Sequence, residues 1–94
     1  MNRPAFKSKF DALGLPAYMY DGIEAYVYSG RYTGNFLEAL LSNDLLRAAA
    51  AADDDNRALL YEWAVFLLNY VPFSAVGSPE KYQEWCRSGG LEGI

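Results

Sequence analysis

The sequence predicts an all-α fold, a compact orthogonal bundle of five or six short helices around a buried central helix at about residues 55–71. The longest apolar run, residues 58–72, repeats its apolar side chains at the spacing of a helix. Glycine and proline divide the rest of the chain into short segments with apolar faces at the same spacing. Residues 25–28 alternate like a strand, but no neighbouring segment has the pattern of a partner strand. We therefore predict a helix there as well.

The first two helices are predicted at residues 3–13 and 17–29. Pro4 suits the first turn of a helix, and Gly14 supplies its end. Gly30 ends the second helix in the same way. The residues expected to face inward are Phe6, Phe10, Leu13, Met19, Ile23, Tyr26 and Val27.

The next two helices are predicted at residues 34–41 and 45–52. Thr33 is the candidate N-cap of the former, and residues 42–44 favour a turn because their side chains compete for local backbone groups. Alanines make the latter a strong helix former. The residues expected to face inward are Phe36, Leu37, Leu40, Leu41, Leu45, Leu46 and Ala49.

The central helix begins after the acceptor side chains of residues 53–56, which can cap its free amides, and ends before Pro72. Its inner face is predicted to hold Leu59, Leu60, Trp63, Ala64, Phe66, Leu67, Tyr70 and Val71. Tyr61, Val65 and Leu68 add apolar groups on the remaining sides. Since a helix that is apolar nearly all round is normally buried, we expect it to be covered on every side. Apolar surface beyond what one small core can hide suggests a homodimer.

The last helix is predicted from Pro79 to about Arg87, with Ser78 as its N-cap and Gly89 beyond its end. Its inward-facing residues are expected to be Tyr82, Trp85 and Cys86. Residues 91–94 are expected to fray.

Length and composition indicate one helical domain spanning residues 1–94, with 52% hydrophobic residues and a net charge of −4. The negative charge disfavours general binding to nucleic acid. A single cysteine, Cys86, excludes an internal disulfide and suits a reducing compartment. Residues 1–10 lack the apolar run of a signal segment, and the central run is shorter than the roughly 20 residues that span a bilayer. We expect a cytoplasmic protein with no membrane partner.

Catalytic residue types are scarce in this chain. Histidine is absent, which removes the commonest general base and the usual metal ligand. A lone cysteine cannot form a zinc cluster. Asp53, Asp54 and Asp55 fit a helix cap with solvated charge better than a cation site, because consecutive aspartates on a helix start point in different directions. We predict no enzymatic activity, no metal and no cofactor.

Tyrosine is abundant between residues 18 and 32. Tyrosine and arginine dominate protein interfaces, so this stretch is the candidate protein-binding surface. The residues proposed for it are Tyr18, Tyr20, Tyr28, Arg31 and Tyr32. The alternative is that these rings close the edge of the core around the first helix.

Four motifs carry a resemblance to a known group of proteins: GNFLEALLSNDLLRA at 34–48, ADDDNRALL at 52–60, LLNYVP at 67–72 and GSPEKYQEW at 77–85. Through them, residues 17–85 resemble a family of small uncharacterised proteins encoded by tailed phages and prophages. The resemblance implies a phage accessory protein in the cytoplasm of a bacterial host, and it implies no catalytic residues.

These observations together predict a small non-enzymatic accessory protein that acts by protein–protein interaction with a host or phage protein. Inhibition of a host defence system would be one instance. The alternative is a nucleic-acid-associated regulator that uses the helices at 34–41 and 45–52 as a helix-turn-helix. The second of these helices carries Arg47 as its only basic residue, which is little for reading DNA.

Overall fold

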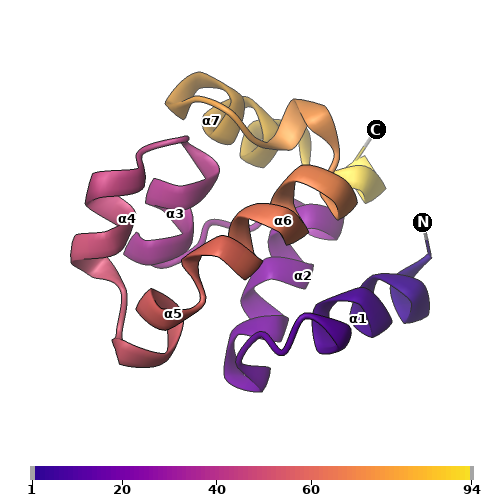
Figure 1. The fold of residues 1–94 in the computed structure, drawn as a ribbon. Coiled ribbons are helices and arrows are strands. Elements are labelled where there is room, and N and C mark those ends of the chain that lie inside the picture. Colours follow the sequence, from indigo (N-terminus) through magenta and orange to yellow (C-terminus); the bar gives the residue numbers. More distant parts are fainter. Residues whose placement is uncertain (1, 94) are drawn as a thin grey trace.

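The computed structural model describes residues 2–93 and confirms an all-α fold (Figure 1). Within these residues there is no strand. The α-helices are α1 (Arg3–Ala12), α2 (Tyr20–Ser29), α3 (Asn35–Leu41), α4 (Leu45–Ala51), α5 (Asp54–Ala58), α6 (Leu60–Tyr70) and α7 (Pro79–Ser88). The short 3₁₀ helices are η1 (Ala17–Met19), η2 (Phe73–Ala75) and η3 (Leu91–Gly93). The helices outnumber the predicted five or six because the central helix is divided into α5 and α6.

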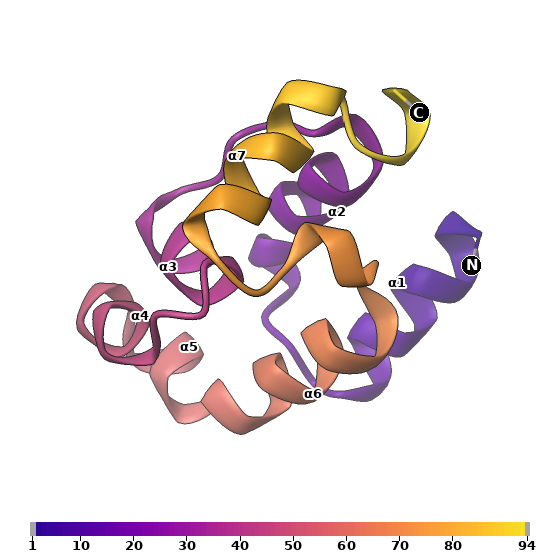
Figure 2. The ribbon, with the colours of Figure 1, turned by 90° about the horizontal axis from the view of Figure 1, so that it is seen from above.

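Helix α6 lies across the front of the molecule in Figure 1, with α2 behind it and α1 packed beside it. Helices α3 and α4 form an adjacent pair, and α7 packs on α3. Figure 2, seen from above, places α5 and α6 at the outer edge of the bundle. Among residues 2–93, no other helix covers that outer side of α6 in either view.

Local side-chain chemistry sets several helix boundaries where the sequence predicts them. Asp53 accepts a hydrogen bond from the backbone N–H of Asn56 at 2.8 Å and starts α5. Ser78 does the same for α7, accepting from the N–H of Lys81 at 3.1 Å. Helix α2 ends at Gly30, which adopts a left-handed φ of 67° that favours glycine. These predicted boundaries are confirmed.

A cluster of aromatic rings joins α6 to α1 and α3. Phe66 of α6 lies 5.0 Å from Phe6 and 5.5 Å from Phe10 of α1, measured between ring centroids. Trp63 of α6 lies 5.8 Å from Phe36 of α3 in an edge-on arrangement. All five side chains are buried, so the inner face of α6 provides the centre of the core.

A second aromatic group holds α7 on α2. The rings of Tyr26 and Tyr82 stack with centroids 5.2 Å apart and planes 13° from parallel. The indole N–H of Trp85 donates to the Tyr26 carbonyl at 2.8 Å, and the Tyr26 hydroxyl donates to the Ala75 carbonyl at 2.6 Å. Burial raises the pKa of Tyr26, so its hydroxyl remains a donor. The predicted inward positions of Tyr82 and Trp85 are confirmed.

The prediction of one continuous central helix is wrong at Leu59. This residue leaves helical geometry with φ −113° and ψ 22°, and it separates α5 from α6. Asn56 is buried beside the break, and its side-chain oxygen accepts a hydrogen bond from the indole N–H of Trp63 at 2.8 Å. This pair satisfies both buried polar groups next to the break.

Helix α6 is buried on one side only, which corrects the expectation that it is covered all round. Trp63 and Phe66 are fully buried, but Tyr61 is 77% exposed and Leu68 is 81% exposed. Ala64, predicted to face inward, is also exposed. The short helices of the described chain pack against one side of α6 and leave the other to solvent.

The predicted packing face of α4 is wrong for its two leucines, whereas Ala49, its third member, is half-buried. Leu45 and Leu46 are 60% and 82% exposed, whereas Ala48 and Ala52 are buried. Helix α4 packs on α3, and the small alanine side chains let the two helices approach closely. The larger leucines therefore lie outside the contact.

The C-terminal segment is ordered against the rest of the chain, in contrast to the predicted frayed tail. Residues Leu91–Gly93 form η3, which packs on α2. The Glu92 carboxylate accepts hydrogen bonds from Arg3 at 2.6 Å and from the Ser29 hydroxyl at 3.0 Å. Ile94, the last residue of the predicted tail, lies outside the described residues.

Candidate protein-binding surface

The tyrosine surface predicted from the sequence is only partly exposed. Tyr20 and Tyr28 are buried, with 7% and 8% of their surface exposed. The Tyr20 ring packs on Phe10 at 5.2 Å, and the Tyr28 ring packs edge-on against Phe6 at 5.6 Å. Helix α1 therefore covers both rings, and their assignment to a binding surface is wrong.

The three remaining residues of that surface, Tyr18, Arg31 and Tyr32, are exposed. Tyr18 lies next to the start of α5, whereas the Tyr32 ring lies 6.2 Å from that of Tyr82 on α7. Helix α5 lies in the lower part of the molecule in Figure 1, and α7 lies at the top. The tyrosines predicted to act together thus occupy separate places.

Tyr18 forms a polar contact that ties η1 to α5. Its hydroxyl donates to the Asp53 carboxylate at 2.5 Å. This hydrogen bond, with the charge of Asp53 and neighbouring Asp55, raises the pKa of Tyr18 to about 12, and the same bond lowers the pKa of Asp53. Tyr18 therefore stays a donor and Asp53 an acceptor at neutral pH.

Within residues 2–93, no group of three or more histidine, cysteine or acidic residues is placed to hold a metal ion.

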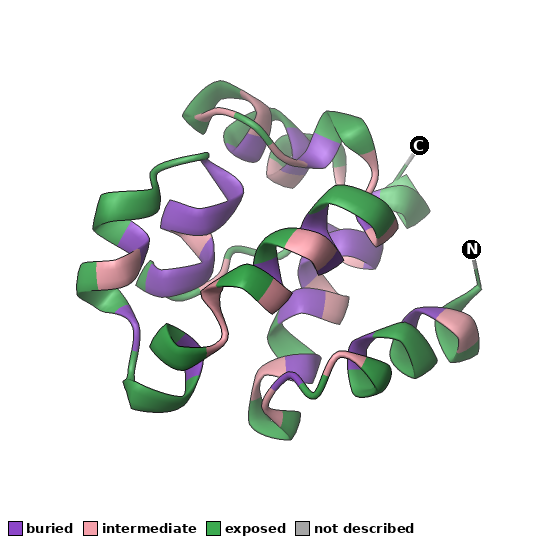
Figure 3. Cartoon of the chain, viewed as in Figure 1, coloured by how far each residue is buried: buried purple, intermediate pink, exposed green. Residues whose placement is uncertain are grey.

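The outer side of α6 has an apolar stripe of its own. Tyr61, Ala64, Val65 and Leu68 follow the i, i+3, i+4, i+7 spacing, which places them on one helix face. Val65 is half-buried and the other three are exposed. Figure 3 shows the exposed side of α6 facing the viewer. Helix α6 thus carries two apolar faces, of which the core uses one.

Helix α4 extends this apolar stripe. A groove of about 300 Å³ lies between α4 and α6, and its lining includes Leu45, Ala64 and Leu68. Leu46, the next residue of α4, is 82% exposed. We name the whole surface the α4–α6 apolar face, which consists of Leu45, Leu46, Tyr61, Ala64 and Leu68. None of these five side chains carries a charge.

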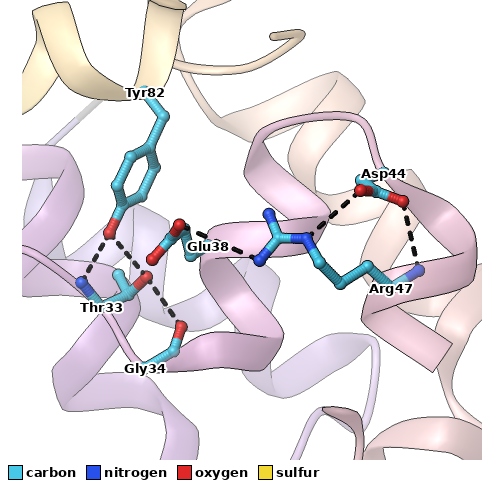
Figure 4. A network of polar contacts seen from close by, with 6 residues as sticks. All are labelled: Thr33, Gly34, Glu38, Asp44, Arg47 and Tyr82. Carbon is cyan, nitrogen blue, oxygen red and sulfur yellow. Dashed lines mark hydrogen bonds and ion pairs between the residues drawn. The ribbon is translucent and has the colours of Figure 1, made fainter. Parts of the chain in front are cut away.

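Polar contacts fix α4 and α7 on either side of α3 (Figure 4). The Arg47 guanidinium pairs with Asp44 at 3.2 Å and with Glu38 of α3 at 3.9 Å. On the other side, the Thr33 backbone N–H donates to the Tyr82 hydroxyl at 2.8 Å, and the hydroxyls of the two residues lie 3.0 Å apart. These contacts hold α4, and with it one wall of the groove, in a defined position.

The same contacts bear on two sequence predictions. Thr33 is not the N-cap of α3, because Gly34 occupies that position and the Thr33 hydroxyl instead meets Tyr82. Arg47, the basic residue of α4, is already paired with two carboxylates. The helix-turn-helix alternative stays a prediction, which gel shifts at low salt would test.

Cys86 is half-buried on α7, in agreement with its predicted inward direction. Burial raises the pKa of its thiol, and the negative charge of Glu38 raises it further. Because the thiolate is the nucleophilic form, this cysteine is a weak nucleophile at neutral pH.

The exposed residues of the α4–α6 apolar face were assigned to the core by sequence reasoning. The signal that could have revealed them is the second apolar stripe on α6, combined with the small number of helices available to cover it.

No family model, curated protein or solved structure matches this chain. The resemblance to phage proteins therefore stays a prediction. None of the helices in residues 2–93 has the length and apolar character needed to cross a bilayer.

Proposed function

We propose that this chain is a non-enzymatic accessory protein, of phage or prophage origin, that binds another protein through the α4–α6 apolar face. The observation that carries the proposal is the exposure of Leu46, Tyr61 and Leu68, which are all more than three-quarters exposed. Several large exposed apolar side chains on two neighbouring helices of a small protein are typical of an interaction site. The partner expected from the sequence is a protein of the host or of the phage.

The energetics of association favour this face over the separated tyrosines. Full burial of an exposed large apolar side chain such as leucine contributes about 1.5–3 kcal/mol. The four large side chains of the face can together offset the lower end of the about 4–15 kcal/mol entropic cost of association. Tyr18 and Tyr32, by contrast, stand alone at separate places, so neither provides a continuous contact surface.

A matched pair of substitutions tests the proposal. Tyr61→Glu places a charge in the α4–α6 apolar face, whereas Tyr32→Glu places one on an exposed tyrosine of the surface predicted from the sequence. Tagged wild-type and variant chains are compared for the proteins they retain from a host lysate, including untagged copies of the chain. Retention that is lost with Tyr61→Glu and kept with Tyr32→Glu supports the proposal. The reverse pattern, or a wild-type chain that retains nothing, would refute it.

A further inference from the structure

We infer that the occupant of the α4–α6 apolar face is a second copy of this chain, docked with its α6 antiparallel to the first. The inference rests on the proposed function and names the partner at that same face. Its basis is the stripe of Tyr61, Ala64, Val65 and Leu68, whose i, i+3, i+4, i+7 spacing is the one that helices use to pack along one another. The partner that fits it is another helix with a similar apolar stripe.

The stripe is compatible with two-fold symmetry. A two-fold axis across α6, between Ala64 and Val65, places Tyr61 of each copy opposite Leu68 of the other. It also places Ala64 of each copy opposite Val65 of the other. A two-fold interface needs this self-complementarity, because the same patch must supply both halves of the contact. The small Ala64 side chain at the centre lets the two helices approach closely.

The groove beside the stripe completes the fit. In the antiparallel arrangement, Tyr61 of one copy lies over Leu68 of the other, and Leu68 lines the groove of about 300 Å³ between α4 and α6. Leu45, Leu67 and Val76 add apolar side chains to the lining, and Asn43 and Asp44 add polar ones. An exposed ring and a mostly apolar groove therefore occur on the same chain. A second copy supplies both at once.

The size of the face agrees with a small dimer interface. The large side chains of the face are 60–82% exposed and present on the order of 500 Å² of apolar surface. Counted on both copies this is about 1,000 Å², the lower limit of a specific interface, whereas a standard interface buries roughly 800 Å² on each partner. Val65, Ala64 and the polar rim of the groove supply further area. The net charge of −4 on each copy repels the other, and salt screens this repulsion. The five residues of the face carry no charge, and Asp44 in the lining of the groove is paired with Arg47.

Sedimentation or light scattering over a concentration series gives the first test. The wild-type chain is expected to reach twice the 10.5 kDa chain mass. Tyr61→Glu and Leu68→Glu are expected to weaken dimerisation about tenfold or more, and Tyr32→Glu to leave it unchanged. Circular dichroism melts confirm that each variant is folded. A wild-type chain that stays monomeric throughout overturns the inference, as does a dimer that both variants leave intact.

Cysteine cross-linking tests the arrangement. In a Cys86→Ser background, Ala64→Cys brings two thiols together near the proposed two-fold axis, whereas Ser8→Cys places a thiol on the exposed side of α1. Mild oxidation is expected to link Ala64→Cys chains and to leave Ser8→Cys chains largely single. Equal linking of the two variants overturns the arrangement. A monomeric wild type that still retains a different protein in a manner sensitive to Tyr61→Glu refutes the dimer alone and leaves the proposed function standing.

Discussion

Replacement of Trp63 by alanine tests whether the inner face of α6 holds the fold together. The indole is fully buried, and the rings of Phe10, Phe36 and Phe66 surround it at centroid distances of 5.8 to 6.3 Å. Its N–H donates to the buried side-chain oxygen of Asn56 at 2.8 Å. The substitution therefore removes a large packed ring and a buried hydrogen bond together.

Both losses can be given a magnitude. Truncation of a buried tryptophan to alanine costs about 3–5 kcal/mol through lost burial and the cavity left behind. The unsatisfied oxygen of Asn56 adds about 1–3 kcal/mol. A chain of this length has a total stability of roughly 5–14 kcal/mol, at about 0.05–0.15 kcal/mol per residue. We expect Trp63→Ala to lose most of its stability or to be unfolded.

Urea denaturation followed by far-ultraviolet circular dichroism measures this loss without relying on tryptophan fluorescence. Tyr32→Ala is the control, because that ring is 69% exposed and its hydroxyl makes one long hydrogen bond of 3.5 Å to Gln83. We expect the control to change stability by about 0.5 kcal/mol or less. A Trp63→Ala variant within about 1 kcal/mol of wild type would show that α6 does not form the centre of the core.

Two further predictions concern other parts of the chain. Tyr18→Phe removes the hydroxyl that lowers the pKa of Asp53. A lowered carboxyl pKa stabilises the fold at pH values above the ordinary carboxyl pKa of about 4, so the variant is expected to melt at a lower temperature at neutral pH. The difference in melting temperature from wild type should shrink as the pH falls through the folded-state pKa of Asp53. A difference that is constant with pH would contradict this linkage. Gly90→Ala is expected to lower the free energy of unfolding by more than about 2 kcal/mol in denaturant titrations, because an added Cβ would lie 2.5 to 2.9 Å from backbone atoms of residues 28–30. Gly14 is the control, because it has the same φ of +72° with open space around it, and Gly14→Ala should lower the free energy of unfolding by only about 1–2 kcal/mol. Equal losses in the two variants would refute the packing argument.

Helix boundaries could be predicted from the sequence because short-range chemistry decides them. Ser78 followed by Pro79 begins α7, and both residues act on backbone groups within one turn. Gly30 ends α2 because it can adopt a left-handed φ, and Pro72 ends α6 because it restricts the residue before it. In these cases the cause lies within a few residues of its effect.

The break at Leu59 could not be predicted in the same way. Nothing in the local sequence requires it, since Leu59 is a good helix former. The break is compatible with the buried hydrogen bond between Asn56 and Trp63, which depends on how α5 is placed on the core. A contact of this kind is a property of the folded chain, so helical periodicity carries no sign of it.

The candidate site was missed because hydrophobicity does not state which neighbour a side chain meets. Leu45 and Leu46 are the most apolar residues of α4, yet the smaller Ala48 is the one that lies fully buried. Likewise, Tyr20 and Tyr28 share a residue type with Tyr18, but α1 packs on their rings and Tyr18 stays exposed. Exposure depends on the packing of whole helices, and this information is not local.

The two faces of α6 predict two separable defects. Trp63 and Phe66 hold the core together, so their loss should abolish folding and association alike. Tyr61 and Leu68 are more than three-quarters exposed and contribute little to the core of one chain, so charged residues at these positions should leave the fold intact. If they abolish association while circular dichroism melts stay near those of a wild-type monomer, the outer stripe serves binding. If they unfold the chain at any concentration, the stripe belongs to the core, and both proposals for the α4–α6 apolar face fail together.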